Sequence, residues 1–281
     1  MSGMVTLTPE LLPNNSVSFE NFCAEKNIPL LIVEDINNIT SLSKLKQFDS
    51  DYILSTWPKI LSNAILSIPR YFTIGSHPTP LPMSRGRHPL HWLICLGIPN
   101  TALTFFRMDN GIDTGSILLQ KYFPVGNSIH DANSNMSNAA KEAIFLLVDT
   151  LTKYPEFKGT KQEENYSNYW RKKDIHDITL DPRMSASMAL RIVNSFSPPY
   201  PGAVLIISRE ESLRILSGSI VSVSTKFPNW KNYEHGYIFY HSNNEITLRF
   251  DDAVLSLIFF PSGKKTACEP GKKIRPPSFY S

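Results

Sequence analysis

Residues 75–92 read GSHPTPLPMSRGRHPLHW, and this polar stretch decides how the first half of the chain is interpreted. It follows a predicted strand over 71–75 and precedes a predicted helix over 89–96, with Pro89 at its first position and Gly97 as its stop. In an open parallel sheet, ligands bind at the carboxyl edge of the strands, where this stretch begins. His77, placed at that edge, could act as a general acid, stabilise an oxyanion or simply bond to a backbone carbonyl.

Short apolar runs alternate with helical patterns on both sides of this stretch. The predicted strands are 5–8, 28–33, 52–55, 71–75, 102–108 and 116–123, and the predicted helices are 19–26, 40–48, 58–64, 89–96 and 138–154. The helix over 138–154 has the clearest periodicity, because its apolar residues recur at steps of three and four. This alternation predicts an α/β fold with a Rossmann-like, mostly parallel sheet.

The pattern changes near residue 157. A polar and charged segment follows, then a predicted helix over 185–195, and between residues 203 and 260 there are only short strands. Clustered short strands of this kind predict a smaller, mainly β domain. The expected organisation is an α/β domain over 1–160, a linker over 161–180, a C-terminal β domain over 181–265 and a tail over 266–281.

Composition excludes several classes of protein. The 281 residues carry a net charge of only +3, too weak to indicate a nucleic-acid or membrane-surface partner. No run approaches the ~20 apolar residues of a membrane span, and residues 1–14 lack a basic start and an apolar core, so neither a span nor a secretory signal is expected. The three cysteines (Cys23, Cys95 and Cys268) have no short spacing, which excludes a disulfide framework and a cysteine zinc site. We expect no metal and a cytoplasmic location.

A second polar segment, residues 108–115, reads MDNGIDTG and forms a glycine-punctuated turn between two predicted strands. An aspartate in such a turn usually bonds to its own backbone. The predicted sheet, however, sets His77 and Asp113 at neighbouring strand ends. A carboxylate beside a histidine favours the charged imidazole and can itself serve as a base.

Taken together, residues 77–82, 85–87 and 109–115 resemble the signature of the 10-formyltetrahydrofolate-dependent formyltransferases. The run RGRHPLHW over 85–92 is more similar to the enzymes that formylate amino sugars on nucleotide carriers, and residues 199–203 resemble the start of the C-terminal domain in the same group. The resemblance extends over about residues 5–260.

This resemblance implies transfer of a formyl group from the co-substrate 10-formyltetrahydrofolate to the primary amine of a nucleotide-linked amino sugar. His77 would stabilise the tetrahedral oxyanion, and Asp113 would tune that histidine and accept the proton that the amine loses. Formylation of methionyl-tRNA is the alternative, and only then would the partner be a nucleic acid. The oligomeric state stays open, although such enzymes often assemble through their C-terminal parts.

The resemblance also implies binding residues. The pterin slot would be lined by the strand and loop containing Leu54, Trp57 and Ile60, largely through backbone groups, and Trp57 could equally be a plain core aromatic. Arg85 and Arg87 would bind substrate, facing either the diphosphate or the folate glutamate, or could be solvated surface residues.

The chain departs from the family pattern in two places. Gly75 stands where the family has an asparagine that provides a second oxyanion donor, a role that Ser76 or a backbone N–H could take over. The opening strand–helix unit of the family fold is apparently absent, since the first predicted strand is 5–8. These departures leave a third interpretation, a catalytically impaired homologue that binds folate or sugar nucleotide without turnover.

Overall fold

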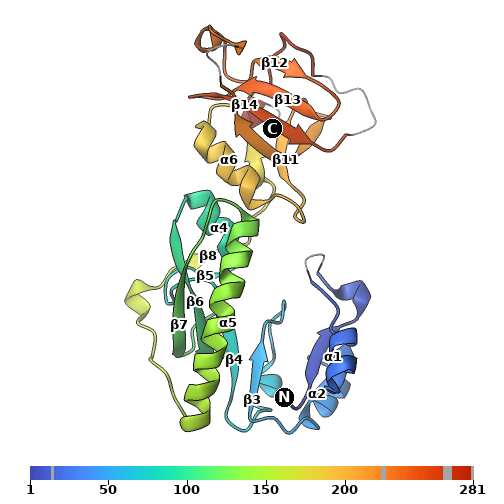
Figure 1. Cartoon of the computed structure of the whole chain (residues 1–281), viewed down its shortest axis with the longest axis vertical. Coiled ribbons are helices and arrows are strands. Elements are labelled where there is room, and N and C mark those ends of the chain that lie inside the picture. Colours follow the sequence, from blue (N-terminus) through green and yellow to red (C-terminus); the bar gives the residue numbers. More distant parts are fainter. Residues whose placement is uncertain (14–15, 223–225, 262–267, 280–281) are drawn as a thin grey trace. The chain divides into compact units, whose positions relative to one another are not determined.

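The fold is described from a computed structural model that covers residues 1–13, 16–222, 226–261 and 268–279 (Figure 1). The chain divides into two compact units. Unit 1 comprises residues 1–89, 101–123 and 136–170, and unit 2 comprises 90–100, 124–135 and 171–281.

Unit 1 is a mixed α/β structure, which confirms the predicted fold class. Its parallel strand pairs include β1 (Met4–Leu7) with β2 (Leu30–Val33), and β3 (Tyr52–Ser55) with β4 (Phe72–His77). The larger sheet has the order β3-β4-β6-β7, where β6 is Asn100–Arg107 and β7 is Ile117–Pro124. The carboxyl end of β4 therefore lies inside the sheet, flanked by β3 and β6.

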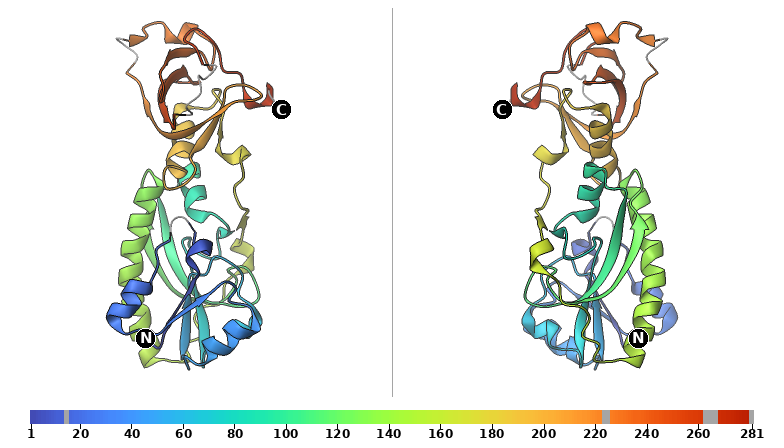
Figure 2. Two further views of the ribbon diagram at one scale, coloured as in Figure 1. Left: turned by 90° about the vertical axis from the view of Figure 1, so that its right-hand side faces the viewer. Right: turned by 90° about the vertical axis from the view of Figure 1, so that its left-hand side faces the viewer.

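The helices of unit 1 are α1 (Glu20–Lys26), α2 (Ile39–Lys46), α3 (Asn63–Leu66) and most of α5 (Ile129–Lys153). Asn38 caps α2, because its side-chain oxygen accepts a hydrogen bond from the Ser41 N–H at 2.7 Å. Helix α5 lies along one face of the larger sheet (Figure 2). It begins at Ile129 rather than at 138, and it buries an alanine and leucine stripe with a period of four residues: Ala139, Ala143, Leu147 and Leu151.

Two details of the strand pairing go beyond the predicted fold class. Among the described residues, no strand pairing joins the β1-β2 sheet to the four-stranded sheet. In addition, β6 runs antiparallel to β4. The reason is the path of the connection after β4: the chain turns back at the same sheet edge instead of crossing the sheet, and such a return produces an antiparallel neighbour.

Unit 2 contains a six-stranded sheet of order β12-β13-β14-β11-β10-β9, which confirms the predicted C-terminal β domain. The strands are β9 (Thr179–Leu180), β10 (Ala203–Ile206), β11 (Ser212–Ile220), β12 (Ile238–His241), β13 (Glu245–Arg249) and β14 (Val254–Phe259). Helix α6 (Ala186–Ser195) adds Ala189, Ile192 and Val193 to the core of this sheet. Helix α4 (Pro89–Leu96) belongs to unit 2 from Leu90 onward.

Two segments are more ordered than the sequence indicates. Within the expected linker over 161–180, β8 (Tyr169–Trp170) pairs with β5 (Arg85–Gly86), and β9 pairs with β10. In the expected tail over 266–281, Cys268 and Ile274 are buried in the core of unit 2, where their apolar side chains are removed from water. Residues 262–267 and 280–281, which span the expected start and end of that tail, lie outside the described residues. No helix in the described ranges is long and apolar enough to cross a membrane.

Candidate active site

The structure brings His77 and Asp113 together. His77 is the last residue of β4, and Asp113 lies in the loop between β6 and β7. The His77 Nδ1 atom is 3.5 Å from Asp113 Oδ2. The side chain of His77 is 6% exposed and that of Asp113 is 18% exposed, so the carboxylate is the more accessible partner.

The second ring nitrogen of His77 is also engaged. Its Nε2 lies 2.8 Å from the carbonyl oxygen of Ser84, and because a carbonyl only accepts, Nε2 carries the hydrogen of this bond. Both ring nitrogens therefore face acceptor oxygens.

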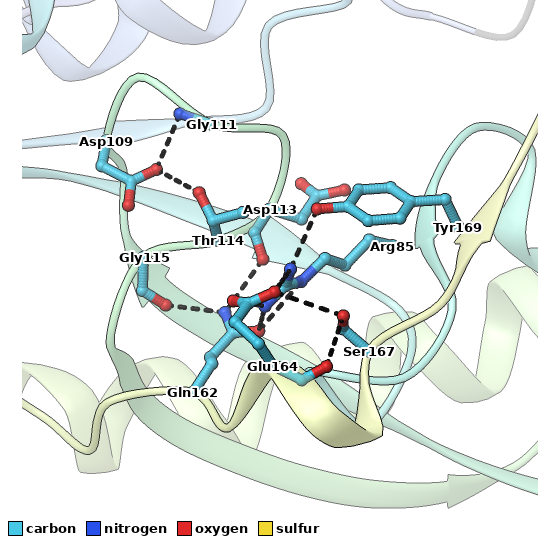
Figure 3. Close-up of polar contacts among 10 residues, drawn as sticks. All are labelled: Arg85, Asp109, Gly111, Asp113, Thr114, Gly115, Gln162, Glu164, Ser167 and Tyr169. Carbon is cyan, nitrogen blue, oxygen red and sulfur yellow. Dashed lines mark hydrogen bonds and ion pairs between the residues drawn. The ribbon is translucent and has the colours of Figure 1, made fainter.

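The Asp113 carboxylate and backbone are both held in place. Oδ2 accepts a hydrogen bond from the Gly86 N–H at 2.9 Å. The backbone carbonyl accepts one from Gln162 Nε2 at 2.9 Å (Figure 3). Asp113 adopts a φ of 56°, a left-handed conformation that is uncommon for a residue with a side chain. The surrounding contacts thus fix an otherwise unfavourable turn.

Arg85 lies inside the protein and not at a substrate surface. Its side chain is wholly buried and donates to Gln162, to both oxygens of Glu164 at 3.0 and 2.9 Å, and to the Tyr169 hydroxyl at 2.9 Å. The hydrogen bonds from Arg85 lower the pKa of Glu164, and those to Glu164 raise the pKa of Arg85. This arrangement corrects the assignment of Arg85 to substrate: a buried guanidinium satisfied by protein groups has no surface to offer.

Arg87, two residues further on, is exposed. Its backbone N–H donates to the Trp170 carbonyl at 2.9 Å, and Gly86 between the two arginines packs so closely on that carbonyl that a Cβ atom would lie 2.4 Å from its oxygen. The backbone is therefore held against β8 while the Arg87 side chain faces outward.

The space beside Gly75 is filled by its neighbour on β6. A Cβ atom at Gly75 would lie 2.7 Å from a ring carbon of Phe106, which is its cross-strand partner. An asparagine would not fit there without displacing Phe106. Because side chains alternate along a strand, Ser76 points to the face opposite His77 and does not replace the missing donor.

The three residues predicted to line the pterin slot differ in their surroundings. Leu54 and Trp57 line a cavity of about 880 Å³ in unit 1, together with Val5, Ile74 and Leu147 among others. Trp57 is half-buried against the apolar cluster around Leu61 and Ile65, as expected for a core aromatic. The remaining residue, Ile60, is 80% exposed and does not line this cavity. Neither His77 nor Asp113 lines it.

Sequence reasoning missed Gln162, Glu164 and Tyr169. They belong to a segment interpreted as a linker, and no periodic pattern marks them. The available signal was the aromatic pair Tyr169 and Trp170 within an otherwise charged stretch, since aromatic residues are unusual in a solvated linker.

Comparison with known proteins finds relatives over the region of the chain that contains His77 and Asp113. Residues 33–148 match the formyl transferase family. Over 189 residues the chain is 30% identical to the methionyl-tRNA formyltransferase of Ehrlichia ruminantium (strain Welgevonden), an alignment that covers 66% of this chain and 59% of that protein. The chain thus spans less than two thirds of the length of this curated relative.

The fold is shared by solved structures of other proteins. A variant of HypX from Aquifex aeolicus superposes with a TM-score of 0.70 at 17% identity, covering 92% of this chain and 47% of that one. An N-formyltransferase from Helicobacter canadensis, in complex with folinic acid and dTDP-3-aminofucose, has a TM-score of 0.58 at 16% identity, covering 89% and 85%.

Proposed function

We propose that this chain, which matches the formyl transferase family over residues 33–148, transfers a formyl group from 10-formyltetrahydrofolate to the primary amine of a nucleotide-linked amino sugar. The observation that carries the proposal is the contact of His77 with Asp113 at the carboxyl edge of β4. This edge is where an open α/β sheet presents its ligands.

The amine is the nucleophile, so the protein has to provide only a base and a stabiliser. The amine nitrogen bonds to the formyl carbon while the bond from that carbon to N10 of the folate breaks. Asp113 accepts the proton that the amine loses and passes it to N10 of the departing tetrahydrofolate, which completes its N–H and regenerates the carboxylate. His77 donates to the formyl oxygen as negative charge develops there, a contribution of about 3–4 kcal/mol.

This role of His77 requires a local change in the structure. The N–H on Nε2 now donates to the Ser84 carbonyl, and a bond to the formyl oxygen would replace that contact. We expect the segment from Pro78 to Ser84 to shift when the substrates bind.

Leu54 and Trp57 are the proposed contacts for the folate that donates the formyl group, because both line a preformed cavity beside β3. Ile60 would contribute its backbone: its carbonyl already accepts a hydrogen bond from Asn37 Nδ2 at 3.0 Å, which holds the loop in place. The exposed guanidinium of Arg87 is the proposed contact for a phosphate of the acceptor.

Two observations support an amino sugar as the acceptor. The resemblance to the Helicobacter canadensis enzyme extends over most of both chains, and that protein holds a dTDP-linked amino sugar. The weak net charge of +3 also fits a small nucleotide better than an RNA surface.

Methionyl-tRNA is the second candidate acceptor, and the 30% identity to the Ehrlichia ruminantium enzyme favours it. A direct competition separates the two: the purified chain is given 10-formyltetrahydrofolate with either a panel of nucleotide-linked amino sugars or initiator methionyl-tRNA. Formylation of a sugar amine supports the proposal. Formylation of the tRNA alone would replace it with the second candidate.

A third outcome is folate binding without transfer to either acceptor, which would identify an impaired homologue. Restoring an asparagine at Gly75 is not a clean test of this possibility, because the side chain would collide with Phe106. Folate binding measured by calorimetry in the absence of an acceptor is the suitable control.

A further inference from the structure

One side-chain amide closes over the turn that carries Asp113. Gln162 Nε2 donates to the Asp113 carbonyl at 2.9 Å and to the Gly115 carbonyl at 2.7 Å (Figure 3). Gln162 is 5% exposed, so water does not compete for these bonds. Because Asp113 has a φ of 56°, its conformation depends on the groups that hold it. Gln162 is in position to provide that hold.

The orientation of this amide is determined by Arg85. Gln162 Oε1 accepts from Arg85 Nε at 3.2 Å and from Arg85 Nη2 at 2.8 Å. A flipped amide would set its NH₂ against the guanidinium and its oxygen against two carbonyls, leaving donors facing donors and acceptors facing acceptors. Only one orientation satisfies both sides, and in it the NH₂ faces the Asp113 turn.

Arg85 is itself immobilised. Two hydrogen bonds to the Glu164 carboxylate and one to the Tyr169 hydroxyl hold the buried guanidinium from the other side. The residue after Arg85 then completes the arrangement, because the Gly86 N–H binds Asp113 Oδ2 at 2.9 Å. Strand β5 therefore holds Asp113 at two points. Its Gly86 N–H binds the carboxylate, and its Arg85 side chain orients Gln162, which binds the backbone carbonyl.

We propose that Gln162 is a positioning residue: it sets the backbone of Asp113 so that the carboxylate stays between the Gly86 N–H and the His77 ring. Arg85 acts one step further back by orienting Gln162. The effect on turnover rests on the proposed function, whereas the effect on the Gly86 hydrogen bond does not.

The test uses Gln162→Glu. Glutamate keeps the shape and an acceptor oxygen for Arg85 but has no N–H for the two carbonyls. Amide hydrogen exchange of Gly86 should accelerate about tenfold, as expected for a weakened hydrogen bond. The amides of Arg85 and Arg87 donate to the Asn168 and Trp170 carbonyls at 3.0 and 2.9 Å, and they should keep their exchange rates.

Unchanged exchange at Gly86 overturns the proposal. So does a parallel rise at Gly86, Arg85 and Arg87, because it would indicate general loosening of this strand. Gln120→Glu is the matched control: Gln120 Nε2 also donates to two oxygens, those of Leu81 and Thr104, at 2.9 and 3.0 Å. No hydrogen bond of Gln120 in the described structure reaches the Asp113 turn, so Gly86 should exchange there as in the wild type.

Kinetics provide the second readout. Gln162→Glu should lower kcat about tenfold with little change in either KM. In an Asp113→Asn background, Gln162→Glu should cause no further loss of kcat, because a residue that acts through Asp113 has no effect once that carboxylate is gone. Additive losses would refute positioning through Asp113. If the wild-type chain formylates no acceptor, the proposed function fails, and the Gly86 measurement still decides the role of Gln162.

Discussion

The Asp113 turn and the Leu54–Ile60 segment, the two parts of the proposed site, are built in opposite ways. The turn is held by buried polar groups from separate stretches of chain, and each contact has a defined donor and acceptor. In the Leu54–Ile60 segment, Leu54 is 48% exposed and Ile60 is 80% exposed.

This difference indicates how each part would work. The groups that hold Asp113 are in place before the substrate arrives, and this avoids the loss of rate that their reorganisation during the reaction would cause. A slot for a large planar ligand can instead rely on backbone groups and be completed by the ligand. Substitutions near Asp113 should therefore change kcat, and substitutions in the Leu54–Ile60 segment should change the KM for folate.

The largest effect is expected at the pair itself. Asp113→Asn keeps an acceptor for the Gly86 N–H but cannot take a proton, so kcat/KM should fall about 10³-fold. His77→Ala should have a comparable effect. Steady-state kinetics measure the loss, and an unchanged Tm shows that the fold is intact. Near-normal turnover in either variant would remove that residue from the mechanism.

The two arginines test the comparison next. Arg85→Leu should lower the free energy of unfolding by about 2–3 kcal/mol, because it leaves the buried Gln162 oxygen without its donors. Arg87→Leu should change stability by less than about 0.5 kcal/mol and raise the KM for the phosphate-bearing acceptor roughly tenfold. Urea unfolding and acceptor kinetics distinguish them. Equal stability losses would contradict the inward and outward placement.

In the Leu54–Ile60 segment, Trp57→Ala should raise the KM for 10-formyltetrahydrofolate about tenfold, as for loss of an aromatic contact worth roughly 1 kcal/mol or more. Ile60→Ala should change it little, because only the backbone of Ile60 is proposed to take part. Titration of folate with each variant measures the difference. If Trp57→Ala lowers stability but leaves folate binding unchanged, Trp57 is a core aromatic only.

The smallest effect concerns acid stability. Arg85 holds the pKa of Glu164 below its usual range, so the pair contributes stability above the unfolded pKa of about 4.3, and that contribution is lost as pH falls through the lower folded value. Glu164→Gln should remove this acid-sensitive part. The difference in Tm between pH 7 and pH 3 should then be smaller than in the wild type. An identical difference would show that the pair has no role in acid stability.

Much of the fold was predictable because it follows local patterns. The strand over 52–55 and the helix over 89–96 have the predicted bounds, and the predicted contact of His77 with Asp113 is present. It forms through the loop after β6, because the antiparallel β6 ends opposite Ile74 and not beside His77. The catalytic and binding roles of these residues stay predictions until the variants are measured.

What the sequence did not reveal lies in loops and distant pairings. The hydrogen-bond partners of the Arg85 side chain lie between 77 and 84 positions further along the chain. Neither periodicity nor spacing connects residues that are so far apart in the sequence. For the same reason, the sequence placed Arg85 and Arg87 together although their side chains have opposite surroundings. The antiparallel direction of β6 was equally hidden, because it depends on the path of the connection after β4 and not on the apolar content of the strand.

The contacts of Arg85 also limit where the chain can be cut. The match to the formyl transferase family ends at residue 148, yet Gln162, Glu164 and Tyr169 all lie beyond it. A recombinant fragment designed on the matched region would keep His77 and Asp113 and lose all three of these partners of the buried guanidinium. The smallest piece of this chain that can be expressed with an intact His77–Asp113 pair therefore has to extend through β8.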